Sequence, residues 1–172
     1  MELLIFSDSH GNADGIRQAL ARQPRRPDAV CFLGDGVRDL DLPALCEVAV
    51  YAVRGNCDWS RTEDVPWTGR TLYLEGHTIL LTHGHLHGVK SGLGGLISYA
   101  ASVGADVVLF GHTHRPTERV LPAGTQVGDR VLERPMYLLN PGSVGYDEDG
   151  EGRSFGTLTL QGDAVLFAHG RL

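Results

Sequence analysis

The sequence predicts an α/β fold built on mixed β-sheet, and three observations lead to this prediction. Short apolar runs alternate with amphipathic segments early in the chain, as strands alternate with helices in α/β proteins. Turn residues between apolar runs late in the chain indicate antiparallel hairpins. The length of 172 residues suits one domain, and we expect a single domain over residues 1–172.

The first part of the chain reads as strand, helix, strand, helix, strand. The run Leu3–Phe6 is wholly apolar and predicts a buried strand. Asn12 is a favourable N-cap residue, and the apolar face that follows predicts a helix to about Arg22. The next predicted elements are a strand at Ala29–Leu33, a short helix at Leu42–Glu47 opened by Pro43, and a strand at Val48–Val53.

The remaining part of the chain predicts further strands and one helix. The polar segment Cys57–Gly69 is expected to be a long loop. The strands Thr71–Leu74 and Thr78–Thr82 should form a hairpin around the turn at 75–77. We then expect a helix at Leu93–Val103, a strand at Asp106–Phe110, short strands and turns from Arg115, and a final hairpin of Gly156–Gln161 with Ala164–Ala168.

Five of the predicted strands lead directly into Asp, Asn or His side chains. Ligands of open α/β sheets bind outside the carboxyl ends of strands, so we expect these side chains to meet at one edge. Gly34, Gly55 and Gly111 would let the backbone turn sharply there. The side chains are Asp8, His10, Asp35, Asn56, His83, His112 and His114.

This donor set indicates a metal site. Imidazoles suit transition metals, carboxylates and amides add oxygen ligands, and the absence of a thiolate-rich set disfavours a structural zinc cage. Seven donors are too many for one catalytic ion with open positions, but they suit two ions that share a carboxylate. Any single motif here is common as a strand-end turn. Their joint placement after five strands is what favours a metal centre.

The motifs also resemble a known family. The ordered set D-x-H, G-D, G-N, H-G-H and G-H-x-H, each after a strand, resembles the calcineurin-like metallophosphoesterases. The segments GNCD and NPGS resemble the YfcE-like group of small phosphodiesterases within that family, and the motifs extend from Asp8 to Ser143. The resemblance implies two mixed β-sheets packed face to face with flanking helices.

The resemblance also implies a reaction, which is hydrolysis of phosphodiester bonds by in-line attack of a hydroxide that bridges two divalent metal ions. Mn²⁺ is the favoured ion, with Ni²⁺, Zn²⁺ and Fe as alternatives. Asn56 would orient a phosphate oxygen as well as bind metal. The implied ligands are Asp8, His10 and His114 for the first ion and Asn56, His83 and His112 for the second, with Asp35 bridging them.

The general acid is less clear from the sequence. Larger protein phosphatases have a histidine where this chain has Cys57, and a neutral thiol is a weak proton donor. His85 and Asp58 are the candidates nearby. His85 is favoured because an imidazolium is the better acid at neutral pH. Asn140 and Ser143 of the NPGS segment are expected to hold the ligand loops in place.

Two alternatives stay open. A phosphomonoesterase would use the same site, with extra positive charge from Arg54, Lys90 or Arg115. A non-catalytic, protein-binding scaffold of the same fold would have lost some of the donors. Because all seven are of the right chemical type, the sequence favours the enzyme.

Composition limits the partners. The net charge of −6 argues against an extended nucleic-acid or anionic membrane surface, so we expect a small phosphodiester substrate. The three cysteines form no disulfide or zinc pattern, and the N-terminal residues do not read as a signal peptide. We therefore expect a cytoplasmic protein without a membrane span, and the resemblance implies a homodimer or homotetramer. The natural substrate is not evident from the sequence.

Overall fold

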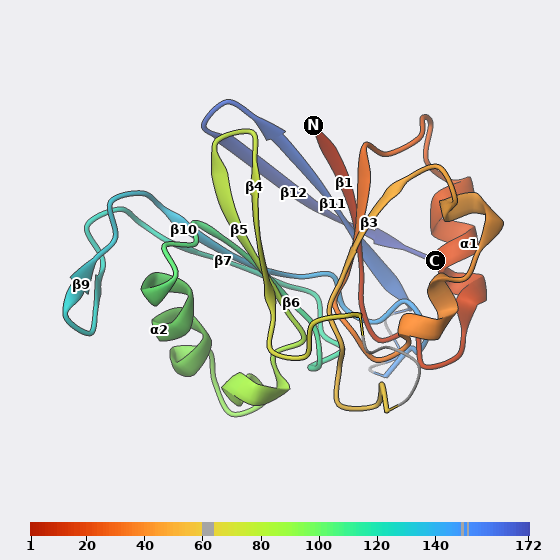
Figure 1. The fold of residues 1–172 in the computed structure, drawn as a ribbon, viewed down its shortest axis with the longest axis horizontal. Helices are drawn as coiled ribbons and strands as arrows, with labels where there is room; N and C mark the ends of the chain where they lie inside the picture. The colour runs from red at the N-terminus through yellow and green to blue at the C-terminus, as the bar shows by residue number, and fades with distance from the viewer. Residues whose placement is uncertain (60–63, 149, 151) are drawn as a thin grey trace.

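Two five-stranded mixed β-sheets form the centre of the molecule. The computed structural model describes residues 1–59, 64–148, 150 and 152–172 (Figure 1). The first sheet has the order β12-β11-β1-β2-β3, and the second has the order β4-β5-β6-β10-β7. The first consists of β1 (Glu2–Phe6), β2 (Ala29–Phe32), β3 (Ala49–Ala52), β11 (Ser154–Gln161) and β12 (Ala164–Arg171). The second consists of β4 (Arg70–Leu74), β5 (His77–Thr82), β6 (Val107–Phe110), β7 (Thr117–Leu121) and β10 (Met136–Asn140).

Helices cover the two outer faces of this pair of sheets. Figure 1 shows α1 (Ala13–Ala21) and α2 (Gly94–Ser102) on opposite sides of the molecule. Three short 3₁₀ turns and a small hairpin complete the described structure: η1 (Val37–Leu40), η2 (Pro43–Leu45), η3 (His85–His87), β8 (Gln126–Val127) and β9 (Arg130–Val131). The layers are therefore helix, sheet, sheet, helix, as the fold class predicted from the sequence requires.

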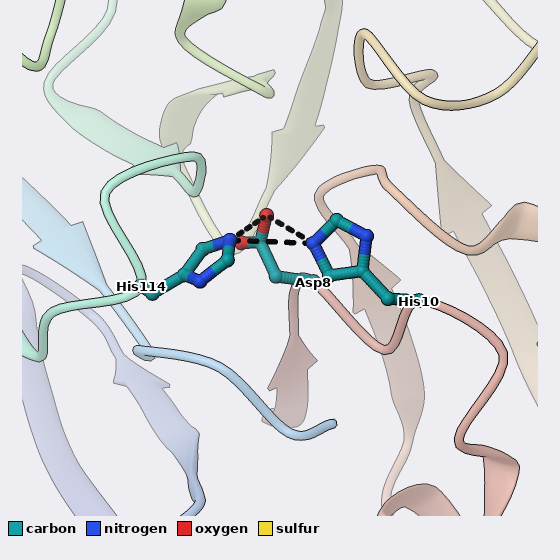
Figure 2. A group of neighbouring side chains, drawn as sticks. All are labelled: Asp8, His10 and His114. Atoms are coloured by element: carbon teal, nitrogen blue, oxygen red, sulfur yellow. Dashed lines mark hydrogen bonds and ion pairs between the residues drawn. The ribbon is translucent and has the colours of Figure 1, made fainter. Parts of the chain in front are cut away.

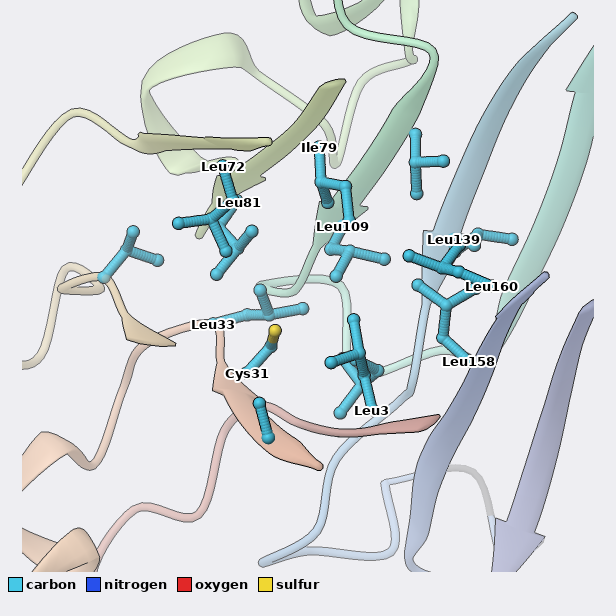
Figure 3. Close-up of a cluster of buried hydrophobic side chains, with 14 residues drawn as sticks. Leu3, Cys31, Leu33, Leu72, Ile79, Leu81, Leu109, Leu139, Leu158 and Leu160 are labelled. Carbon is cyan, nitrogen blue, oxygen red and sulfur yellow. The ribbon is translucent and has the colours of Figure 1, made fainter. Parts of the chain in front are cut away.

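The core between the sheets follows from the period-2 alternation of strand side chains. In β1, Leu3 and Ile5 point into a cluster shared with the second sheet, whereas Leu4 and Phe6 pack in the cluster that contains Ile16 of α1. Figure 3 shows the shared cluster, with Leu3, Cys31 and Leu33 facing Leu81 and Leu109. Strands of this kind are apolar on both faces because both faces are covered.

The parallel pairs set the position of the site. β1, β2 and β3 are mutually parallel neighbours, and so are β5, β6 and β10 in the second sheet. Their carboxyl ends therefore share an edge within each sheet. The strands β11, β12, β4 and β7 pair antiparallel: β11 and β12 extend the first sheet beyond β1, and β4 and β7 are the two edges of the second sheet.

Three local expectations need correction. The predicted helix at Leu42–Glu47 is only the 3₁₀ turn η2, since so short a segment before β3 cannot repay helix nucleation. Asn12 stands at the N-cap position, but its Nδ2 donates to the Gly145 carbonyl 2.9 Å away and caps nothing. His77 belongs to β5 and not to the turn, because it pairs with Leu74 of β4; its buried ring also bonds Asp106 and Gly162.

The predicted loop at Cys57–Gly69 is confirmed where it is described. Residues 57–59 and 64–69 form neither helix nor strand, and residues 60–63 lie outside the described part of the chain. The hairpin of β11 and β12 is also confirmed, with its turn at Gly162 and Asp163.

Candidate metal centre

The structure brings all seven predicted donors to the carboxyl ends of the central strands. Asp8 and His10 follow β1, Asp35 follows β2 and Asn56 lies beyond β3 in the first sheet. His83 follows β5, and both His112 and His114 follow β6 in the second sheet. Three groups with ligand atoms within 4.8 Å of one another emerge among the described residues. The first is Asp8, His10 and His114, and the second is Asp35, His83 and His112; a third, His10, Asp35 and Cys57, shares a member with each of them.

The first group converges on one carboxylate oxygen. His114 Nε2 lies 3.2 Å and His10 Nε2 lies 3.8 Å from Asp8 Oδ1, and the two nitrogens are 3.3 Å apart. Figure 2 shows the two rings facing each other, with Asp8 between and behind them. Asp8 Oδ1 is buried, and none of the described residues makes a geometrically acceptable hydrogen bond to it. An acceptor of this kind is costly unless a cation or donor occupies the space before it.

Asp35 lies between the two groups. Its Oδ2 is 3.4 Å from His83 Nε2 in the second group and 3.8 Å from His10 Nε2 in the first. Asn56 joins the second group through its Oδ1, which is 3.2 Å from His83 Nε2. Asp35 Oδ2 thus lies within 4 Å of an imidazole of each group. Asp8 Oδ1 also comes within 3.9 Å of His83 Nε2, but Asp35 is the carboxylate closer to that ring.

Five of the seven donors have a left-handed backbone. The φ angles are 56° at Asp8, 47° at His10, 59° at Asp35, 68° at His112 and 60° at His114. Among the described residues only one other non-glycine residue, Glu75, has a positive φ. Each such residue costs roughly 1–2 kcal/mol, and such strain concentrates at functional sites. The fold therefore holds these side chains against a local energetic preference.

Hydrogen bonds donated by the Nδ1 atoms orient two of the histidines. His83 Nδ1 donates to the Leu33 carbonyl at 2.7 Å, and His114 Nδ1 donates to a Glu148 carboxylate oxygen at 2.7 Å. Because both partners only accept, the Nε2 atoms are the ones that face the centre. This arrangement is typical of metal-binding histidines. The role of Glu148 was not predicted, since it lies in an acidic segment that resembles an ordinary solvated turn.

Asp58 positions the loops that carry Asp35 and Asn56. Its two carboxylate oxygens accept hydrogen bonds at 2.8–3.0 Å from four backbone amides, those of Asp35, Gly36, Val37 and Gly55. The side chain is buried and fully committed to these bonds. A carboxylate whose two oxygens both accept backbone hydrogen bonds is poorly suited to donate a proton. Asp58 therefore has a structural role and is not the general acid.

The NPGS segment holds the ligand loops, as expected. Asn140 Nδ2 donates to the Gly111 carbonyl at 3.0 Å, and Ser143 Oγ donates to the Asp8 carbonyl at 2.9 Å. Ser7 Oγ and the amide of His112 both donate to Asp8 Oδ2. Asp8 is therefore fixed through one oxygen while the other faces the centre.

The glycines of these loops serve two different purposes. Gly34 has a φ of 96° and makes the predicted sharp turn. Gly55 and Gly111 have no positive φ. A Cβ at Gly55 would overlap Asp35 Oδ1, and one at Gly111 would overlap Ser7 Oγ. These two positions need glycine because other groups of the site approach the backbone closely.

The histidines differ in charge state. Burial lowers the pKa of His112 to about 4, helped by the nearby charges of His83 and Lys90. Burial opposes the charged form of His83 as well, but its hydrogen bond to Asp35 and the charge of Asp8 outweigh burial and raise its pKa. The close contact with the Asp8 carboxylate likewise raises the pKa of His114. Burial would raise the pKa of Asp35, yet the contact with His83 holds it well below its usual range.

His85 lies at the rim of the centre. Its ring centroid is 5.3 Å from that of His83, 6.1 Å from that of His112 and 5.2 Å from that of Trp67. Burial and the charge of His83 lower the pKa of His85. The imidazolium form that acid catalysis requires is therefore disfavoured near neutral pH. Burial and the neighbouring Asp35 carboxylate raise the pKa of Cys57 to about 11, so this thiol stays protonated.

A cavity of about 400 Å³ opens beside the first group. Its lining includes His10 and Asp35 at the centre, Arg38 and Cys57, and the indole of Trp59, which is 83% exposed. A polar centre with an exposed aromatic ring at its edge suits a small organic ligand that carries a charged group.

Comparison with known proteins places this geometry in a family. The model of the calcineurin-like phosphoesterase superfamily domain matches residues 1–163. The chain is 35% identical to the probable metallophosphoesterase YsnB of Bacillus subtilis, covering 96% of this chain and 88% of YsnB. It is 36% identical to the phosphodiesterase YfcE of Escherichia coli K12, covering 92% and 87%.

A solved structure shares the fold. A conserved protein of Streptococcus pneumoniae TIGR4, described as a predicted phosphoesterase, superposes with a TM-score of 0.75 at 23% identity, over 99% of this chain and 88% of that one. In the described part of the chain, none of the helices has both the length and the apolar character needed to cross a membrane.

Proposed function

This chain belongs to the calcineurin-like phosphoesterase superfamily, and from that premise we propose that it is a phosphodiesterase that works with two divalent metal ions. The observation that carries the proposal is the convergence of donors around Asp8 Oδ1, a buried oxygen to which no described residue makes a hydrogen bond. A metal cation placed among these groups would satisfy this oxygen and the facing imidazole nitrogens together.

The ligand sets follow the two groups of side chains. Asp8, His10 and His114 would hold the first ion, and His83, His112 and Asn56 would hold the second. Asp35 would bridge them, since its Oδ2 lies within 4 Å of an imidazole of each group. Mn²⁺ is the ion we favour, and Ni²⁺, Zn²⁺ and Fe suit the same donors.

Bound divalent ions supply Lewis acidity and lower the pKa of water, so that hydroxide exists at neutral pH for in-line attack at phosphorus. The side chains of this chain do the positioning. Asp58 fixes the loops of Asp35 and Asn56, and Leu33 and Glu148 orient His83 and His114. The amide of Asn56, whose Oδ1 contacts His83, would orient a phosphate oxygen.

The leaving group receives little help from a general acid in this arrangement. His85 stays the candidate, but its lowered pKa makes it a poor acid at neutral pH, and the charge of bound cations would lower that pKa further. We therefore propose that the enzyme prefers diesters with acidic leaving groups such as aryl alcohols. The relatives named phosphodiesterase and metallophosphoesterase support the reaction class.

The test is a metal add-back assay on chelator-treated protein. Mn²⁺, Ni²⁺ and Zn²⁺ are supplied separately, and hydrolysis of bis(p-nitrophenyl) phosphate and p-nitrophenyl phosphate is followed side by side. We expect Mn²⁺-dependent cleavage that favours the diester. Asp35→Asn should lower kcat/KM by roughly 100-fold or more. Asp163→Asn, at the exposed turn between β11 and β12, is the matched control and should behave as wild type.

Three outcomes would count against the proposal. Folded protein that cleaves neither ester with any metal would favour a binding scaffold. Faster cleavage of the monoester would favour a phosphomonoesterase. Full activity in Asp35→Asn would remove Asp35 as the bridging ligand.

The cytoplasmic location and the homodimer or homotetramer stay predictions. Light scattering would test the oligomeric state.

A further inference from the structure

A second cavity lies against the loop that carries His112 and His114. It has a volume of about 440 Å³ and includes Thr113, the residue between these two histidines, in its lining. Val89, Leu93 and Phe110 give it apolar wall atoms, and Lys90 and Arg115 add two cations. It shares no lining residue with the cavity beside His10 and Trp59. The first cavity is lined by two of the donors, whereas the second is lined by none of them and borders the centre through Thr113 and through Glu148, which accepts the hydrogen bond from His114.

Lys90 is the most distinctive residue of this second cavity. It is the only lysine in the 172-residue chain, which otherwise uses arginine for its basic side chains. It is exposed, and none of the described residues forms a hydrogen bond or ion pair with it. Its charge acts on both His112 and His114, so it lies within electrostatic reach of the candidate centre.

The carboxylate in the lining of this cavity, that of Glu148, already contacts a histidine of the candidate centre. Glu148 contributes to the lining, but its carboxylate accepts the hydrogen bond from His114 Nδ1. The ammonium of Lys90 is thus left to attract an outside anion. Apolar walls with a cation at the border suit a ligand that has an apolar body and an anionic end.

A phosphodiester has two organic arms, whereas a phosphomonoester has one. We propose that the second cavity, which we call the Lys90 subsite, binds one arm of the substrate and selects an arm that carries a further anionic group such as a phosphate. This inference rests on the proposed phosphodiesterase function and specifies its substrate class. The arm on the opposite side of phosphorus would lie in the cavity beside Trp59.

The test compares two probes that differ by one anionic group. Both are thymidine 5′-(p-nitrophenyl phosphate) diesters, one with a free 3′-hydroxyl and the other with a 3′-phosphate. Release of p-nitrophenol is measured with Mn²⁺-loaded enzyme. We expect kcat/KM to be about tenfold higher for the 3′-phosphorylated probe, mainly through a lower KM, because a charge-assisted contact acts on binding.

Variants locate the effect. Lys90→Met should reduce the preference to near one, and Lys90→Arg should keep most of it because the charge remains. Arg130→Met, on the exposed β8–β9 hairpin, removes one positive charge elsewhere and should keep the full preference.

The outcomes separate this inference from the proposed function. Cleavage of both probes with equal kcat/KM would overturn the Lys90 subsite while leaving the phosphodiesterase intact. A preference that persists in Lys90→Met would overturn it as well. Failure to cleave either probe, or bis(p-nitrophenyl) phosphate, would overturn the proposed function itself.

Discussion

The histidines of the candidate centre occupy different electrostatic environments, and this difference has a consequence for metal binding. His83 and His114 each contact an aspartate, which raises their pKa values. His112 is buried beside positive charge, and its pKa of about 4 keeps it neutral across the physiological range. His112 can therefore accept a metal ion without losing a proton, whereas His83 and His114 must first be deprotonated.

Metal binding should accordingly release protons near neutral pH. A histidine with a raised pKa holds its proton more tightly, so the proton competes with the metal and the competition grows as pH falls. We expect the Kd for Mn²⁺ to rise as pH is lowered from 8 to 6. Calorimetric titrations at pH 7 in buffers of different ionisation enthalpy should report the released protons. A Kd that is constant over this range, with no proton release, would contradict the assignment of His83 and His114.

The side chain of Asp58 makes most of the hydrogen bonds that set the relative position of the turns after β2 and β3, and the amide of Cys57 adds one to Asp35 Oδ1 at 2.7 Å. Asp58 binds three amides of the turn after β2 and the Gly55 amide of the turn after β3. These turns carry Asp35 and Asn56, which come from neighbouring parallel strands. The two elements are thus fixed relative to each other before any metal binds.

Asp58→Asn tests this link between elements. An amide side chain would point its NH₂ group at backbone donors, so at least one buried N–H would lose its acceptor. We expect the free energy of unfolding to fall by about 1–3 kcal/mol and the affinity for Mn²⁺ to fall by roughly 10–100-fold. Urea denaturation and a Mn²⁺ titration measure the two effects.

Asp163→Asn serves as the matched control here too, because it makes the same chemical change at an exposed turn. If Asp58→Asn were as stable as the control and bound Mn²⁺ as tightly, the four hydrogen bonds would not hold the ligand loops.

At the scale of the whole molecule, the candidate centre joins the two sheets. Asp8 and His10 follow a strand of the first sheet, whereas His114 follows a strand of the second, and the second group is likewise shared. A metal ion in either group would therefore connect the sheets at one edge, beyond the core shown in Figure 3.

Removing metal should then lower the stability of the entire fold. At 100 times its Kd, a ligand that binds only the folded state adds about 2.7 kcal/mol. For a chain of this size that corresponds to a rise in Tm of roughly 5–10 °C. Thermal unfolding with EDTA and with excess Mn²⁺ measures the difference, and Asp35→Asn should show a smaller one. Equal Tm values for wild type in both conditions would contradict a metal centre between the sheets.

Much of this arrangement was predictable from local sequence. The strands were predicted because buried strands are short apolar runs, and their polar carboxyl-terminal neighbours marked the donors from Asp8 to His114. The errors at Leu42–Glu47 and at Asn12 have a common reason. In both places a local propensity yields to a tertiary constraint, either the short connection to β3 or the carbonyl of Gly145.

Local sequence was enough to locate the strands that precede the donors and to identify the chemistry of each donor, because apolar runs and side-chain functional groups are local properties. Which donors meet depends on the packing of the two sheets. His10 and His114 are 104 residues apart in the chain, yet their Nε2 atoms lie 3.3 Å apart. The buried Asp8 Oδ1, the clamp formed by Asp58, the contact of Glu148 with His114 and the cavity around Lys90 depend in the same way on how the two sheets pack. Contacts between remote segments leave no local pattern, so they became visible only in the folded molecule.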